Sequence, residues 1–304
     1  MIDYYLGWNP KLQAIGRLLI AWVILECESV QLRNEGNANG RETLINSPYM
    51  VDRERTKGLD PKNFKDDWCR FVIHQLAIRC ESSADIFRNA VRFVTFNYDI
   101  SFERALYRGL QLIEMFKPEH VKEFLDKNRV MHVYGKVREN PFEQPPELKW
   151  SEQSRDPKDL QSPPLAQHLL EYKVFLDELY AASQGIHVID PADKETNKDT
   201  IKKAIDEIDP TKYVYILGYG FDENNSDRLD LPRLLHYERA KEKYVFFTNF
   251  GDINRVTKRA SKIFFGRSNQ FAPGVLVESG GSNRYERSFR NVYEALELDF
   301  DQFD

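Results

Sequence analysis

The sequence predicts an α/β fold with a parallel sheet covered by helical layers. Two observations carry this prediction. The stretch 91–99 (VRFVTFNYD) is a short run of β-forming apolar residues, typical of a covered strand. In the last third of the chain, helical and strand patterns alternate, which favours crossover connections and parallel strands. The expected elements there are helices at 197–208, 228–242, 253–260 and 285–296, strands at 213–217 and 244–248, and a candidate strand at 262–265.

The first part of the chain predicts helices separated by a polar segment. Residues 12–28 are apolar on nearly every side, so we expect a helix buried between layers. Residues 29–60 are rich in Asn and Gly and predict a long surface insertion. Residues 61–80 predict a helix. Its expected inner face consists of Trp68, Phe71, Val72 and Leu76.

The middle of the chain predicts further helices, at 101–116, 120–127 and 165–183, and short strands at 129–134 and 185–190. Residues 139–164 are rich in proline and charge, which predicts a loop. We therefore expect a helical segment with a long polar insertion over 1–90, and a sheet-bearing core over 91–304.

Composition excludes some classes of protein. The chain has 304 residues, 41% of them hydrophobic, which suits one large or two small domains. The net charge of -5 argues against a general nucleic-acid binder. The apolar stretch 12–25 is short and is interrupted by Arg17, so we expect no membrane partner. Asp3 stands where a signal peptide would be basic, which predicts a cytoplasmic protein.

The cysteines predict no metal site. Cys27, Cys69 and Cys80 include no pair with C-x-x-C spacing, and a structural zinc site needs four closely paired ligands. We expect no zinc and read these residues as free thiols in a reducing compartment.

The candidate site residues follow the expected strands. Polar residues at the carboxyl ends of parallel strands point into the crevice where open α/β sheets bind ligands. We therefore expect one pocket that holds the amide of Asn97 and the imidazole of His132. The strand ends carry Thr95, Asn97 and Asp99, then His132, then Gly218, Tyr219, Gly220 and Phe221, followed by Asp222 and Asn225.

Each of these residues also has a purely structural interpretation. Asn97 and Asp99 could be turn and cap residues. His132 could be a hydrogen-bonded core residue. The pair Gly218 and Gly220 could mark only a turn, and Asp222 could simply cap a helix.

The combination resembles the sirtuin-like family over about residues 91–265. The shared elements are Thr95-Phe96-Asn97-Tyr98-Asp99, His132-Val133-Tyr134-Gly135 and Gly218-Tyr219-Gly220-Phe221. Residues 2–24 are also similar to a segment of bacterial sirtuin-like proteins with an unassigned or phage-defence role. The resemblance implies a Rossmann-like fold that binds NAD as its substrate.

The resemblance also implies residue roles. Asn97 would order the nicotinamide ribose and an attacking water, and Asp99 would lie by the carboxamide. His132 would act as general base on ribose hydroxyls. The turn at 218–221 would lie along the adenosine half. Thr95 and Asn225 are also expected among the cofactor-binding residues. Since family deacylases carry a four-cysteine zinc module, NAD hydrolysis is favoured over acyl-lysine removal.

One element of the family pattern is missing. The family's first strand ends in a glycine loop that binds the pyrophosphate, and no G-x-G occurs before Asn97. We therefore expect a sheet that lacks its first strand. The alternatives are a non-catalytic nucleotide-binding or interaction module, and an ADP-ribosyl transferase. A homo-oligomer or an activating partner is compatible with each.

Overall fold

The chain divides into two compact units. Unit 1 comprises residues 1–54 and 81–197, and unit 2 comprises residues 55–80 and 198–304. The expected domain boundary lies between residues 90 and 91, and both of these residues fall in unit 1. The structure, a computed structural model, describes residues 9–37, 68–127, 130–140, 142, 165–187, 198–238, 242–266, 277–278 and 284–288. The fold is of mixed α/β class, with small parallel sheets.

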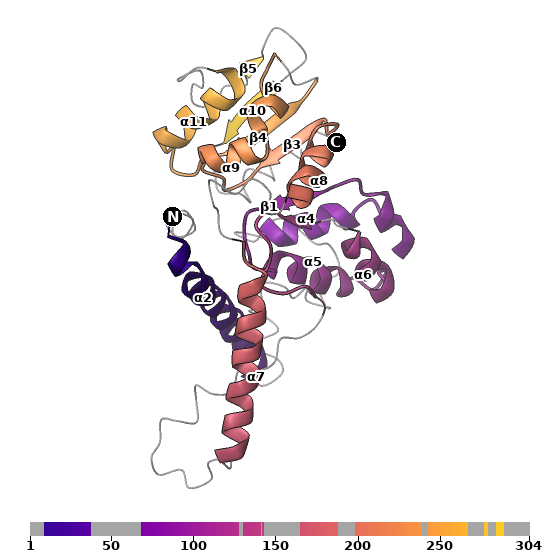
Figure 1. The fold of residues 1–304 in the computed structure, drawn as a ribbon. Helices are drawn as coiled ribbons and strands as arrows, with labels where there is room; N and C mark the ends of the chain where they lie inside the picture. The colour runs from indigo at the N-terminus through magenta and orange to yellow at the C-terminus, as the bar shows by residue number, and fades with distance from the viewer. Residues whose placement is uncertain are drawn as a thin grey trace. The chain divides into compact units, whose positions relative to one another are not determined.

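Two long helices pack together in unit 1. Helix α2 (Pro10–Asn37) contacts α7 (Leu165–Gln184), and Figure 1 shows the two helices crossing. Trp22 of α2 meets Phe175 of α7 edge to face, with 6.4 Å between the ring centroids. Such a contact stabilises a helix pair by apolar burial together with favourable ring geometry.

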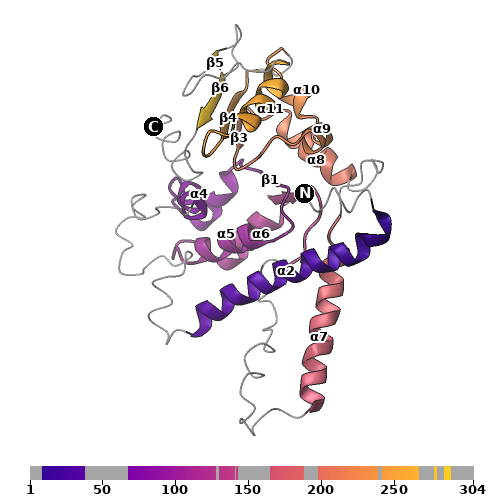
Figure 2. The same cartoon turned by 90° about the vertical axis from the view of Figure 1, so that its left-hand side faces the viewer.

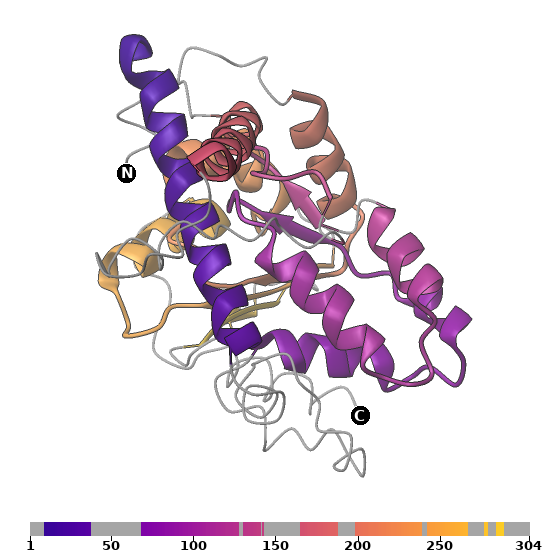
Figure 3. The same ribbon diagram turned by 90° about the horizontal axis from the view of Figure 1, so that it is seen from below.

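The shorter helices of unit 1 pack against one another. Helices α5 (Ser101–Gln111) and α6 (Pro118–Asp126) lie side by side, as Figure 3 shows, and η3 (Ser83–Arg88) contacts α6. Strands β1 (Phe93–Thr95) and β2 (Val130–His132) pair in parallel. This sheet is smaller than the sequence predicts, because the expected strand 91–99 is reduced to three half-exposed residues.

Gly135 lets two segments of unit 1 approach closely. It follows β2, has a φ of +78° and pairs with Ile186 in an isolated antiparallel bridge. A Cβ atom at position 135 would overlap the Gly185 carbonyl oxygen. The bridge is the described part of the expected strand 185–190, whose residues 188–190 lie outside the described residues.

Unit 2 is built on a four-stranded sheet. Its order is β3 (Tyr213–Ile216), β4 (Tyr244–Thr248), β6 (Arg284–Ser288) and β5 (Val277–Glu278). The pairs β3–β4 and β4–β6 are parallel, whereas β5–β6 is antiparallel. The helices of this unit are α4 (Trp68–Ala77), α8 (Lys198–Ile208), α9 (Glu223–Arg228), α10 (Leu231–Leu234) and α11 (Asn254–Phe265). Figure 2 shows α9, α10 and α11 on the same side of the sheet.

Aromatic side chains form the core between this sheet and α11. The Phe221 ring meets Phe247 of β4 and Phe264 of α11 nearly at right angles, with centroid distances of 5.3 and 5.6 Å. All three side chains are completely buried, as is Tyr285 of β6. The Tyr285 hydroxyl donates to the Leu235 carbonyl over 2.7 Å, and burial raises its pKa.

Three predicted elements in unit 2 are wrong. In place of the expected helix 228–242, α9 ends at Arg228, the short helix α10 follows, and residues 235–238 are irregular. The candidate strand 262–265 is the last turn of α11, whose Ile263, Phe264 and Phe265 are buried on its inner face. The expected terminal helix 285–296 begins instead as strand β6, because backbone pairing with β4 takes up residues 284–288. Residues 289–296 lie outside the described residues.

The helices near the N-terminus also differ from expectation. α2 is not buried on all sides, since Ile15, Leu19 and Val23 are 51–62% exposed. α2 extends to Asn37, into the expected insertion, whose remainder at 38–60 lies outside the described residues. In α4, Ile73 is buried and Val72 is not. The expected loop 139–164 is described only at 139–140 and 142.

Candidate functional site

The turn between β1 and α5 carries three of the expected site residues. The Asn97 N–H donates to the Thr95 hydroxyl oxygen over 3.0 Å. The Asp99 carboxylate accepts from the Ser101 N–H over 3.2 Å and also from the Ser101 hydroxyl. A carboxylate that binds the first N–H groups of a helix stabilises its start. Thr95 and Asp99 therefore shape the turn, while Asn97 is exposed on it.

His132 lies beside this turn because β1 and β2 run in parallel. Their register places Thr95 opposite His132, and the Val133 N–H donates to the Thr95 carbonyl over 2.9 Å. The His132 Nδ1 lies 2.7 Å from the Asn97 carbonyl oxygen. The structure thus brings residues 97 and 132 together, but the contact is made by the main chain of Asn97 and not by its amide side chain.

The second nitrogen of His132 faces Glu103 of α5. Nε2 lies 2.6 Å from Glu103 Oε1, and the two residues are 7% and 6% exposed. A carbonyl oxygen can only accept, so Nδ1 donates to Asn97. The remaining contact shares one proton between Nε2 and the carboxyl group, as imidazolium with carboxylate or as neutral imidazole with carboxylic acid.

The surroundings of His132 favour its charged form. Burial alone would lower the pKa of the imidazole, but the hydrogen bond and the charge of Glu103 outweigh that effect. The Asn97 carbonyl raises the pKa further, and Lys136 opposes it weakly. The net result is a His132 pKa above its ordinary value. Among the described residues, Glu103 Oε2 has no hydrogen-bond partner, so the carboxylate depends on His132.

Glu103 is the site residue that the sequence reasoning missed. The sequence could have indicated Glu103 by its position in the helical stretch that follows the strand. Glu103, Leu106 and Leu110 are spaced at i, i+3 and i+7 and share the buried face of α5. A carboxylate on an otherwise apolar helix face requires a buried partner, and this spacing indicates that one exists.

The turn after β3 carries the second group of expected residues, and it belongs to unit 2. Gly218 has a φ of +64°, and its N–H donates to the Thr248 hydroxyl at the end of β4 over 2.9 Å. A Cβ atom at Gly218 or Gly220 would meet nothing within 4 Å, so the turn faces open space. The Tyr219 hydroxyl lies 3.0 Å from the Ser226 hydroxyl of α9.

The remaining residues of this group have structural surroundings. Phe221 is completely buried and anchors the turn in the aromatic core of unit 2. The Asp222 carboxylate accepts from the Asn225 N–H over 3.4 Å and caps α9. Asn225 is 7% exposed. Gly218, Tyr219 and Gly220 are therefore the members of this group that border open space.

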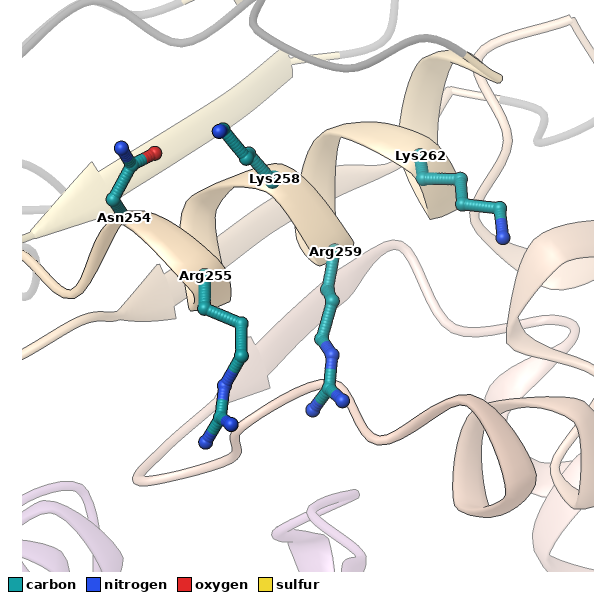
Figure 4. Close-up of a pocket in the computed structure, with 5 residues that line it drawn as sticks. All are labelled: Asn254, Arg255, Lys258, Arg259 and Lys262. Carbon is teal, nitrogen blue, oxygen red and sulfur yellow. The ribbon is translucent and has the colours of Figure 1, made fainter.

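A shallow hollow in unit 2 was not expected from the sequence. It has a volume of about 400 Å³ and is lined by α11 residues only, as Figure 4 shows. The lining residues are Asn254, Arg255, Lys258, Arg259 and Lys262. The spacing R-x-x-K-R-x-x-K could have identified this basic helix face, because it repeats at i, i+3, i+4 and i+7.

Comparison with known proteins gives no match to a protein-family model, a curated protein or a solved structure. Within the described part of the chain, no helix combines the length and apolar character needed to cross a bilayer. Nor do the described residues include a group of three or more side chains placed to bind a metal ion.

Proposed function

We propose that this chain binds a dinucleotide of the NAD class and hydrolyses its nicotinamide–ribose bond. The observation that carries the proposal is the position of His132 between Asn97 and Glu103. A histidine oriented by a buried carboxylate is suited to accept a proton when it is neutral, and the raised pKa makes that neutral form a stronger base.

In the proposed reaction, water adds to the ribose carbon as the bond to nicotinamide breaks. Nicotinamide leaves as a neutral molecule, and the ribose passes through an oxocarbenium-like state. A ribose hydroxyl takes the place of the Asn97 carbonyl at His132 Nδ1. This step uses the imidazole in its neutral form, after the Nδ1 proton has passed to solvent. The one remaining proton lies on Nε2 toward the Glu103 carboxylate, and Nδ1 accepts the proton that the reaction releases. The exposed Asn97 amide orients the ribose and the water.

A second candidate is a nucleotide-binding module without catalysis. It is favoured by one observation: both ring nitrogens of His132 already have partners within the protein. In this alternative the His132–Glu103 pair only joins β2 to α5, and a ligand binds without bond cleavage.

Nicotinamide release from NAD tests the proposal. We expect Asn97→Ala and His132→Gln to lower the rate by about 10²–10⁴-fold, because each removes an orienting or proton-accepting group. Gln184→Ala, which removes an exposed amide elsewhere in unit 1, should leave the rate unchanged. Equal release by all these proteins would refute the assignment. Calorimetric NAD binding without release would establish the second candidate.

A further inference from the structure

The basic face of α11 concentrates positive charge beside an open turn. Arg255 and Arg259 are one helical turn apart, and Figure 4 shows both guanidinium groups extending to the same side of α11. Lys258 and Lys262 also line the hollow of about 400 Å³, but Figure 4 shows the Lys258 side chain extending to the opposite side of α11 from the two guanidinium groups. Arg259 Nη1 lies 3.5 Å from the Gly220 carbonyl oxygen, so the guanidinium reaches the turn after β3.

The positive charge of this face is only partly balanced. Lys262 forms an ion pair with Glu223 over 2.8 Å, and both side chains are exposed. Arg255 and Lys258 have no ion-pair partner among the residues that the structure describes. The inner face of the same helix packs against the aromatic core, so α11 holds these cations on a fixed backbone.

Helix energetics disfavour this arrangement in the absence of an anion. The first turn of α11 contains no acidic residue and begins with Asn254 and Arg255. Cations near a helix N-terminus oppose the helix dipole, and like charges at i and i+4 repel each other. A bound anion would relieve both effects.

The position of the hollow favours a small ligand. α11 directly follows β4, so its first turns lie at the carboxyl edge of the parallel strands, where α/β sheets bind ligands. The volume of the hollow is within the range of small-molecule sites. Its lining side chains end in four cationic groups and one amide, which suits phosphate groups, and their aliphatic stems supply the rest of the surface. The chain's net charge of -5 argues against a nucleic-acid backbone as the ligand.

We propose that Arg255 and Arg259 bind the diphosphate group of a nucleotide, with Lys258 and Lys262 adding positive charge to the same helix. Guanidinium groups bind phosphate oxygens through paired charge-assisted hydrogen bonds, and such bonds are stronger than neutral ones. The diphosphate site rests on unit 2 alone, whereas naming NAD as its natural ligand rests on the proposed function.

Calorimetric titration of the full chain with inorganic pyrophosphate, ADP and adenosine tests this site. We expect pyrophosphate and ADP to bind more weakly as salt rises, and adenosine to bind least. Arg255→Gln/Arg259→Gln should raise the dissociation constants of pyrophosphate and ADP by at least about tenfold. The control Lys202→Gln/Lys203→Gln removes two exposed charges from α8 and should change neither constant.

Three results would overturn the diphosphate site: no binding of pyrophosphate or ADP, equal losses in both double variants, or displacement of ADP by short single-stranded DNA at lower concentration than by pyrophosphate. An unchanged KM for NAD in Arg255→Gln/Arg259→Gln would contradict NAD as the natural ligand of this site while leaving NAD cleavage intact. Conversely, pyrophosphate binding that depends on the two arginines, without nicotinamide release, would contradict only the proposed function.

Discussion

Glu103 Oε1 lies 2.6 Å from His132 Nε2, and each of these two residues is less than a tenth exposed. Because His132 Nδ1 also faces the Asn97 carbonyl, the imidazole connects β2, the turn after β1 and helix α5. The protonation of this pair therefore affects the stability of unit 1 as well as any proton transfer.

The first prediction concerns pH. The folded-state pKa of His132 is raised, so its contribution to the free energy of unfolding is fully present below the unfolded pKa of about 6.5. That contribution is lost as pH rises through the folded pKa. Urea unfolding between about pH 5 and pH 9 should show this loss in the wild type. Glu103→Gln should abolish it, whereas Glu119→Gln, an exposed acid on α6, should retain it. A wild-type stability that stays constant over this range would contradict the pairing.

The second prediction concerns Gly135. Gly135→Ala introduces a Cβ atom that overlaps the Gly185 carbonyl at a φ of +78°. We expect it to lower the free energy of unfolding by roughly 2–5 kcal/mol. Gly220→Ala, where the added atom meets open space, should cost less than about 1 kcal/mol. Thermal unfolding of both variants checks this, and similar losses would contradict the close approach.

The third prediction concerns the aromatic core of unit 2. Phe221→Ala removes a completely buried ring that contacts Phe247 and Phe264. The loss of burial and the remaining cavity should cost about 3–5 kcal/mol. Phe250→Ala removes a ring that is 70% exposed and should change stability by less than about 0.5 kcal/mol. Denaturant unfolding of both variants tests this prediction. Equal midpoints would contradict the assignment of Phe221 to the core.

The fourth prediction concerns Lys243, which is 3% exposed. Its ammonium donates to the carbonyls of Ile208, Asp209 and Thr211 over 2.6–2.9 Å. Lys243→Met keeps the aliphatic chain but leaves these carbonyls without their donor, which should cost roughly 2–5 kcal/mol. Exposed Lys212→Met is the matched control and should be nearly neutral. Chemical denaturation distinguishes the two, and a tolerant Lys243→Met would show that water replaces the ammonium.

Secondary structure could be predicted where the pattern and the local packing agree. The expected strand 244–248 has the bounds of β4, because YVFFT is a β-forming run whose last four residues are buried. β6 was wrongly predicted as helix because RYERS carries three charged residues and a single aromatic, which is no strand pattern. Backbone pairing with β4 decides its structure. In α2, apolar residues on every side do not reveal which side will be covered.

Only part of the candidate site could be predicted from the sequence. Parallel pairing of two strands brings their carboxyl ends together, so the proximity of residues 97 and 132 followed from the sequence. The contact through the Asn97 carbonyl depends on the turn geometry, which the residue types do not determine. The basic face of α11 was not predicted as a site, because a charged helix face is usually solvated surface.

The division into two units has a practical consequence for dissection of the protein. The chain passes from one unit to the other at residues 54–55, 80–81 and 197–198, so neither unit is one uninterrupted piece. A fragment that starts at residue 198 would leave α4 behind, together with its buried Phe71 and Leu76. Expressing the two halves separately would therefore require rejoining 55–80 to 198–304 through an engineered connection.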